Sequence, residues 1–191
     1  MSNSRTDTRK QILDCAETLM LSRGFNAFSY QHISSQLGVK NAAIHYHFPS
    51  KTDLGVAVIQ RFRRRFARWT EREGQLTADP WMRLEWYFDL LGRYYDDDQK
   101  ICPTGMLSAE FHALPEPMQA EAQAFALGLI NWGGDILRDG VERGYFRFPG
   151  SVADKTLQIF AALQGALQLA RVQPAALEAV IKQIRLDLGA R

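Results

Sequence analysis

The sequence predicts an all-α protein. Apolar residues recur at intervals of three or four through most of the 191 positions, as at Leu54, Val58 and Phe62, which is the period of a helix with one buried face. Glycine and proline interrupt this pattern at points that suit helix ends, such as Gly24 and Pro80. No segment shows the strict alternation of a strand. Together these observations predict about nine helices and no sheet.

The periodicity and its interruptions place the helices in order along the chain. We expect them at residues 6–23, 30–37, 42–48, 51–73, 80–98, 103–113, 118–143, 151–172 and 174–188. Gly24 and Gly38 suit helix ends, because glycine adopts the left-handed conformation there without strain. Residues 74–79 form a break between two apolar helices. We therefore predict an N-terminal domain of residues 6–66 and a C-terminal domain of residues 75–191.

Two of the expected helices carry features that need interpretation. Helix 118–143 contains Gly133-Gly134, which either kinks it or lets another helix approach closely. Helix 51–73 bears five arginines beside its apolar stripe, and we interpret most of them as a solvated face. They are Arg61, Arg63, Arg64, Arg65 and Arg68.

The composition narrows the class of protein. A hydrophobic content of 46% with 11% aromatic residues excludes wholesale disorder. No apolar run approaches the roughly 20 residues of a membrane span, and the polar N-terminus has no signal-peptide core. Cys15 and Cys102 lie far apart and form neither a disulfide framework nor a metal-binding pattern. We expect a cytoplasmic protein without a membrane segment, a bound metal or a cofactor.

Charge is distributed unevenly along the chain. Residues 1–72 carry 12 Lys and Arg against 5 Asp and Glu, whereas residues 73–191 carry 11 against 16. A basic first third followed by an acidic remainder suits a polyanion-binding domain attached to a domain that stays off the polyanion. Charge can also segregate by chance, so this signal gains weight only from its coincidence with a motif.

That motif is residues 29–48, which we interpret as two short helices around a tight turn. Ser29 suits the N-cap of the first helix, Gly38 ends it, and Asn41 suits the N-cap of the second. Ile44 and Phe48 lie one turn apart and face inward. Small, polar and aromatic groups are left outside, as a helix-turn-helix needs in order to enter a DNA major groove.

The string Gly38-Val39, five residues and His45-Tyr46-His47-Phe48-Pro49-Ser50-Lys51-Thr52-Asp53-Leu54 resembles the tetracycline-repressor (TetR) family. The resemblance covers residues 6–66, and His45 stands where many members carry tyrosine. It implies an N-terminal three-helix DNA-binding domain and a C-terminal helical domain that binds a ligand and dimerises. It also implies a palindromic double-stranded DNA operator, a homodimer formed through the last two helices, and a small-molecule effector whose identity the sequence does not specify.

On this basis we assign DNA contacts by residue chemistry. Lys40 and Asn41 suit base edges or phosphates, since lysine matches guanine acceptors and asparagine matches adenine. Tyr46 and Lys51 suit phosphates, the latter because it begins a helix. The complete set is Ser29, Tyr30, Gln31, Lys40, Asn41, Ala42, Ala43, His45, Tyr46 and Lys51.

A ligand site is predicted in the C-terminal domain from its apolar and aromatic helices. Such a lining suits an apolar or amphipathic small molecule, although a filled core is the competing interpretation. The candidate residues are Phe88, Leu91, Tyr95, Cys102, Met106, Phe111, Phe125 and Trp132. Cys102 precedes Pro103 at an expected helix start, where a thiol can become reactive. Its modification is a second candidate signal.

An enzyme is not predicted, because the sequence has no glycine-rich phosphate loop, nucleophile elbow or zinc spacing. His45 and His47 are two apart on an expected helix and face different sides. We therefore predict no catalytic residue and no metal ligand. The function we favour is a repressor that leaves its operator when a ligand binds or Cys102 is modified. The alternatives are an all-α ligand-binding protein that does not bind DNA, an enzyme with a helical active site, and a transcriptional activator of the same fold.

Overall fold

The computed structural model describes residues 3–96 and 102–189. Across these residues every regular element is helical, with nine α-helices and one short 3-10 helix, and the predicted all-α class is confirmed. The chain divides into two compact units. The first unit comprises Met1–Phe66 and Pro103–Phe125, and the second comprises Ala67–Cys102 and Ala126–Arg191.

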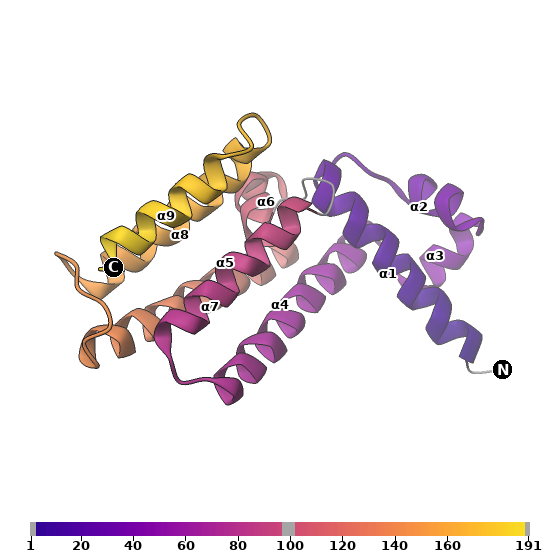
Figure 1. Ribbon diagram of the computed structural model, residues 1–191. Helices are drawn as coiled ribbons and strands as arrows, with labels where there is room; N and C mark the ends of the chain where they lie inside the picture. Colours follow the sequence, from indigo (N-terminus) through magenta and orange to yellow (C-terminus); the bar gives the residue numbers. More distant parts are fainter. Residues whose placement is uncertain (1–2, 97–101, 190–191) are drawn as a thin grey trace. The chain divides into compact units, whose positions relative to one another are not determined.

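The first unit is built from helices that precede and follow part of the second unit in the sequence. Its elements are α1 (Asn3–Arg23), α2 (Tyr30–Leu37), α3 (Asn41–His47), the first part of α4 (Lys51–Leu76), α6 (Pro103–Ala109), a 3-10 helix (Phe111–Ala113) and the start of α7 (Glu116–Glu142). Helix α1 packs against α2 and α3 (Figure 1). Ile12, Ala16 and Met20 of α1 are fully buried, as are Ile33 of α2 and Ile44 of α3.

Several helix boundaries differ from the prediction, and three of the differences have a clear physical reason or change an assigned cap. Helix α1 begins at Asn3 instead of residue 6, because the polar N-terminal segment contains no proline or glycine to stop it. Helix α3 has Lys40, and not Asn41, at its N-cap. Helix α4 continues through Gly74 to Leu76. Glycine inside a helix costs only about 1 kcal/mol, so the predicted break is shorter than residues 74–79.

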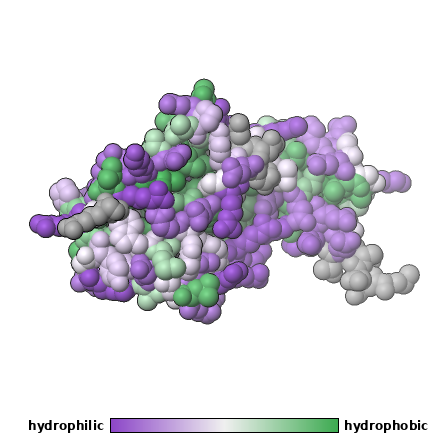
Figure 2. Space-filling view, in the orientation of Figure 1, coloured by the Kyte–Doolittle hydropathy of each residue, from purple (hydrophilic) through white to green (hydrophobic). Residues whose placement is uncertain are grey.

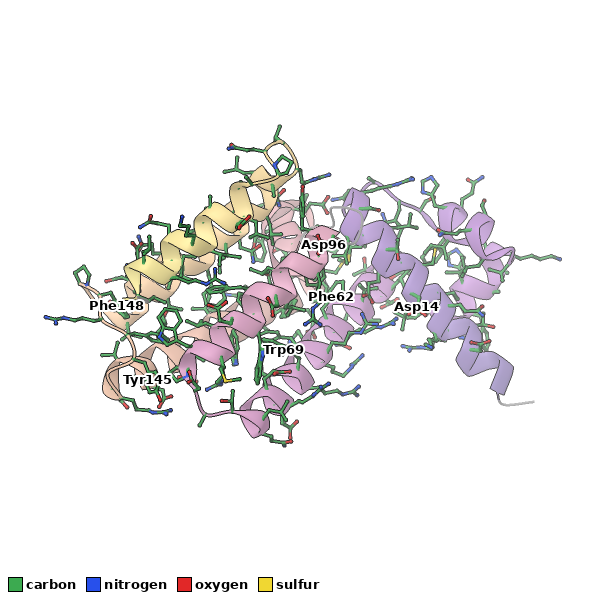
Figure 3. The ribbon with its side chains drawn as sticks, in the orientation of Figure 1. Asp14, Phe62, Trp69, Asp96, Tyr145 and Phe148 are labelled. Carbon is green, nitrogen blue, oxygen red and sulfur yellow. The ribbon has the colours of Figure 1, made fainter. Side chains whose placement is uncertain are left out.

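Three of the five arginines of α4 form ion pairs, whereas Arg64 and Arg68 are exposed, as a solvated face requires. Arg61 forms ion pairs with Asp14 and Glu17 of α1, and Arg65 also pairs with Glu17. Arg63 pairs with Glu121 of α7. These contacts fasten α4 to its neighbours in the first unit. Asp14 is labelled on α1 in Figure 3.

The second unit contains the remaining helices. They are the end of α4, α5 (Pro80–Asp96), most of α7, α8 (Val152–Ala170) and α9 (Ala176–Asp187). Helices α8 and α9 lie side by side (Figure 1). Helix α5 is capped by Asp79, whose Oδ1 accepts the backbone N–H of Trp81 at 2.8 Å. We expected this helix to reach Asp98, and residues 97 and 98 lie outside the described residues.

Two glycines of α7 accommodate phenylalanine rings within the second unit. A Cβ on Gly133 would lie 2.1 Å from the ring of Phe160 on α8, and a Cβ on Gly140 would lie 2.0 Å from the ring of Phe146. Helix α7 is continuous from Glu116 to Glu142. Of the two interpretations of Gly133-Gly134, close approach of another helix is therefore the one observed at Gly133.

Hydrophilic residues cover much of the face shown in Figure 2, and hydrophobic residues form scattered patches on it. Helix α8 carries an ordered row of exposed apolar and small residues. Leu157, Ala161, Gly165 and Leu169 are all exposed and follow one another at intervals of four residues. Leu157 and Leu169 are 52% and 58% exposed. This spacing places an apolar and small-residue stripe along one exposed face of α8.

Candidate nucleic-acid interface

The turn between α2 and α3 places Gly38 in the left-handed conformation that was predicted for it. Gly38 has a φ of 67°, in the left-handed region, and the N–H of Val39 donates to the carbonyl of Ser34 at 3.1 Å. Ile33 and Ile44, one on each helix, have no exposed surface. A fixed turn and buried apolar side chains on both helices hold the angle between α2 and α3, as a helix-turn-helix requires.

Side chains next to the helix-turn-helix also anchor the starts of two helices. At α2, the backbone N–H of Ser29 donates to Nδ1 of His32 at 3.0 Å. At α4, the N–H of Asp53 donates to Oγ of Ser50 at 3.1 Å, and the N–H of Ser50 donates back to Oδ2 of Asp53 at 3.0 Å. This reciprocal pair is a capping box, and it satisfies two otherwise unpaired backbone donors.

Tyr30 lies inside the first unit and not on its surface. Its hydroxyl donates to the carbonyl of Phe48 at 2.8 Å, and its ring lies 4.7 Å from that of His45. Burial, reinforced by the negative charge of Asp53, raises the pKa of Tyr30 to about 12. The hydroxyl is thus already engaged in joining α2 to the end of α3, although the sequence placed this residue among the DNA contacts.

The outer face of α3 carries most of the other assigned contacts. The residues with exposed side chains there or at its N-cap are Lys40, Asn41, Ala42, His45 and Tyr46, and Ala43 is half-buried. Tyr46 is 66% exposed. The Nδ1 of His45 lies 3.2 Å from the carbonyl oxygen of Pro49, so one ring nitrogen is occupied. On α2, Gln31 is exposed. The face offers small, polar and aromatic groups together.

Lys51 is placed differently from the expectation of a free phosphate ligand. Its Nζ lies 4.4 Å from the ring centre of Phe25 and 4.7 Å from that of Phe28. Burial lowers the pKa of Lys51, and the carboxylate of Glu110 acts in the opposite direction. The ammonium therefore stabilises the turn between α1 and α2, and reaching a phosphate requires it to leave the two rings.

Known proteins with a similar sequence and a similar fold belong to one family. A family model described as bacterial regulatory proteins of the tetR family matches residues 12–58. The crystal structure of a TetR transcriptional regulator from Legionella pneumophila is 32% identical, with a TM-score of 0.86 over 95% of this chain and 97% of that chain. The chain belongs to the TetR family. It is a DNA-binding transcriptional regulator.

Other TetR-family proteins resemble the chain over nearly its full length. The crystal structure of a TetR-family regulator from Agrobacterium tumefaciens has a TM-score of 0.92 and 28% identity, covering 96% of this chain and 98% of that chain. The HTH-type transcriptional repressor NemR of Escherichia coli K12 is 26% identical over 175 residues, which are 87% of this chain and 85% of NemR. The fold is therefore that of the family throughout and not only at the helix-turn-helix.

The eight assigned ligand-binding residues of this TetR-family protein fall in both units. Phe88, Leu91, Tyr95, Cys102 and Trp132 belong to the second unit, whereas Met106, Phe111 and Phe125 belong to the first. Most of them are buried, as a filled core would also require. Cys102 is 6% exposed, and its Sγ accepts a hydrogen bond from Nε2 of Gln164 at 3.5 Å.

Sequence reasoning missed two residues of this TetR-family protein whose surroundings are unusual. Glu110 accepts a hydrogen bond from the backbone N–H of Phe25, at a distance of 2.7 Å from N to Oε2. Tyr87 is 2% exposed, and its hydroxyl has no hydrogen-bond partner among the described residues. No local signal marked either one, because both environments depend on chain segments distant in the sequence.

The described residues form neither a metal-binding cluster nor a membrane-spanning helix. Residues 3–96 and 102–189 contain no group of three or more His, Cys, Asp or Glu side chains able to hold a metal ion. No helix formed by these residues is both long and apolar enough to cross a membrane.

Proposed function

We propose that this TetR-family protein is a repressor that binds a palindromic operator as a homodimer and releases it when a small molecule occupies the second unit. The observation that carries the DNA part is the outer face of α3, braced by Ile33, Ile44 and the Gly38 turn. Repression, and not activation, is proposed because NemR is named a repressor and is similar over 87% of this chain.

We assign each residue of the DNA-binding face a role that fits its placement. Lys40 and Asn41 contact base edges or nearby phosphates. Ala42 and Ala43 allow close approach to the groove floor, and Tyr46 donates to a phosphate together with Ser29 and Gln31. Tyr30 supports the face from inside, and Lys51 contacts a phosphate only after leaving its two rings. His45 keeps its Pro49 contact and offers its other ring nitrogen.

The dimer interface is proposed on α8 and α9. The stripe of Leu157, Ala161, Gly165 and Leu169 is exposed, and an apolar helix face of this kind is buried in an assembled protein. Small residues at its centre let a second copy of the helix approach closely. A two-fold dimer then presents two α3 helices to two half-sites that are one or more helical turns apart. Leu169→Glu should convert the dimer into a monomer in light-scattering measurements.

The DNA-binding proposal is tested by footprinting the DNA that flanks the protein's own gene. Protection of a palindromic segment, lost in Tyr46→Ala, supports it. Arg138→Ala is the matched control, since Arg138 is exposed, lies in the second unit and pairs only with the neighbouring Asp135 among the described contacts. Wild-type protein that protects no palindrome, or Tyr46→Ala protein that protects it equally well, contradicts the placement of the recognition helix.

Modification of Cys102 is a second route to operator release. The specific observation is the amide donor of Gln164 directed at its sulfur. Because Cys102 is buried, a reagent reaches the thiol only when the second unit opens locally. Thiol titration with intact-protein mass measurement, compared between wild type and Cys102→Ser, decides this route. If the two proteins release the operator equally after treatment, Cys102 is not the sensor.

A further inference from the structure

In the part of the chain that the structure describes, the hydroxyl of Tyr87 is a buried donor without an acceptor. The side chain is 2% exposed, and no group among the described residues forms a hydrogen bond with its oxygen. Leaving a hydroxyl buried and unpaired is unfavourable, because the group loses its hydrogen bonds to water without gaining a replacement. Such groups are uncommon in native proteins and call for a partner that the protein alone does not supply.

Aromatic rings surround this hydroxyl-bearing side chain within the second unit. The ring of Tyr87 lies 5.4 Å from those of Trp132 and Phe160 and 6.4 Å from that of Trp69. Trp69, labelled on α4 in Figure 3, lies 5.4 Å from Trp132. The two tryptophans are half-buried, whereas Tyr87 and Phe160 are buried. The two tryptophans therefore form the partly exposed side of the cluster, and Tyr87 and Phe160 form its buried side.

The electrostatic surroundings of the hydroxyl indicate which polar group would satisfy it. Burial raises the pKa of Tyr87 well above its ordinary value, and the groups that add to this effect are Cys102 and Tyr94. These are a thiol and a phenol. Arg83 lies one turn earlier on α5, and its buried Nε also has no hydrogen-bond partner among the described residues, but Arg83 is not among the groups that shift the pKa of Tyr87.

We infer that the effector is an uncharged, flat aromatic molecule with an oxygen acceptor, such as an aryl ketone, ester or lactone. It packs against Trp69 and Trp132 and accepts the hydrogen bond of Tyr87. Flat rings supply the contact area, and one directed donor supplies orientation. A charged ligand would lose its hydration in this cluster without gaining an opposite charge at the hydroxyl. This inference rests on the proposed ligand-controlled release and specifies the ligand's chemistry.

The test uses three probes of matched size with the full-length protein. They are 2-acetylnaphthalene, which has an acceptor oxygen, 2-ethylnaphthalene, which has none, and 2-naphthoate, which is charged. Equilibrium dialysis gives the dissociation constants for wild type, Tyr87→Phe and Tyr145→Phe. Tyr145 is a matched control, because it is an exposed tyrosine in the same unit and its hydroxyl accepts a hydrogen bond from Arg143. Tyr87→Phe removes only an unpaired group, so it should fold with unchanged or higher stability.

We expect wild type to bind the ketone, and Tyr87→Phe to weaken that binding about 3- to 10-fold, the effect of one hydrogen bond. Binding of the hydrocarbon should change less than about 2-fold, and Tyr145→Phe should change neither. The inference is overturned if wild type does not bind the ketone, or if Tyr87→Phe affects ketone and hydrocarbon equally. Tighter binding of 2-naphthoate than of the ketone also overturns it, and points to Arg83 as the recognition group.

Operator binding is measured separately by fluorescence anisotropy of labelled DNA. The ketone should release the operator from wild type, and Tyr87→Phe should need about 3 to 10 times more of it. If the protein binds the operator but no probe acts through Tyr87, the inference fails and the DNA-binding proposal stands. If no DNA is bound at all, the proposed function fails, while the dialysis results still decide whether Tyr87 binds an acceptor.

Discussion

Replacing Glu110 by alanine should loosen the connection between α6 and the turn that follows α1. The Glu110 carboxylate accepts the N–H of Phe25 at 2.7 Å, and it occupies the space beside Gly24 where a Cβ would lie only 2.0 Å from Oε1. It also acts electrostatically on Lys51, which lies over the rings of Phe25 and Phe28. One side chain from the end of α6 thus holds the backbone and, indirectly, a cation next to the DNA-binding helices.

The magnitude follows from the type of hydrogen bond that is lost. A bond to a charged group contributes about 1.5–3 kcal/mol, and Glu110→Ala also leaves the Phe25 N–H without its acceptor. For a chain of this size that corresponds to a fall in melting temperature of roughly 3–12 °C. Glu110→Gln keeps an acceptor oxygen and loses only the charge, so its loss should be smaller, about 1 kcal/mol.

The measurement is urea unfolding followed by circular dichroism, with operator affinity determined on the same samples. Glu71→Ala is the control, because Glu71 is exposed on α4. We expect the order of stability to be wild type and Glu71→Ala, then Glu110→Gln, then Glu110→Ala. If Glu110→Ala unfolds at the same urea concentration as Glu71→Ala, the Phe25 contact does not stabilise the unit and the reasoning is refuted.

Three other predictions concern packing, pH and salt. Gly133→Ala should destabilise the protein by about 1–3 kcal/mol in urea unfolding, because its Cβ meets Phe160, whereas Gly128→Ala meets nothing within 4 Å and should stabilise it by up to about 1 kcal/mol. Since the pKa of Tyr30 is raised to about 12, its contribution is complete below about pH 10 and is lost as the pH rises to 12. Tyr30→Phe should therefore reduce the alkaline loss of stability in that range, and an unchanged pH profile would count against the burial argument. Operator affinity should fall steeply with salt, and Tyr46→Ala should weaken binding at every salt concentration without changing the slope of log K against log salt, because tyrosine carries no charge.

Local features of the fold were predictable from the sequence because their causes are local. The helices follow from apolar spacing, and the turn at Gly38 follows from the need for a left-handed residue. The capping role of Ser50 is likewise contained within four residues of chain. Helix ends were less predictable: α4 runs through Gly74 because a single glycine costs little compared with the packing of the rest of the helix.

The side-chain environments were not predictable, since their causes lie far along the chain. Tyr30 looked like a surface contact, yet the carbonyl of Phe48, 18 residues later, holds its hydroxyl inside. Lys51 looked like a free cation, yet aromatic rings that precede it in the sequence lie beneath it. Phe25, the hydrogen-bond partner of Glu110, is 85 residues away in the sequence, and no local sequence pattern predicts such a pair. The same holds for Tyr87, whose hydroxyl has no hydrogen-bond partner among residues 3–96 and 102–189.

The contacts of Gly133 and Gly140 with phenylalanine rings restrict how α7 and α8 can move relative to each other when the second unit responds to a signal. Gly133 and Gly140 are seven residues apart, so they lie on one side of the helix, and each holds a phenylalanine ring. A slide of α8 along α7 by one turn, about 5.4 Å, would carry Phe160 from Gly133 onto Leu129 or Leu137. Both are leucines with buried side chains, and neither leaves room for a ring. A one-turn translation of α8 along α7 is therefore unfavourable, and a rotation of α8 that keeps Phe160 against Gly133 is favoured over it.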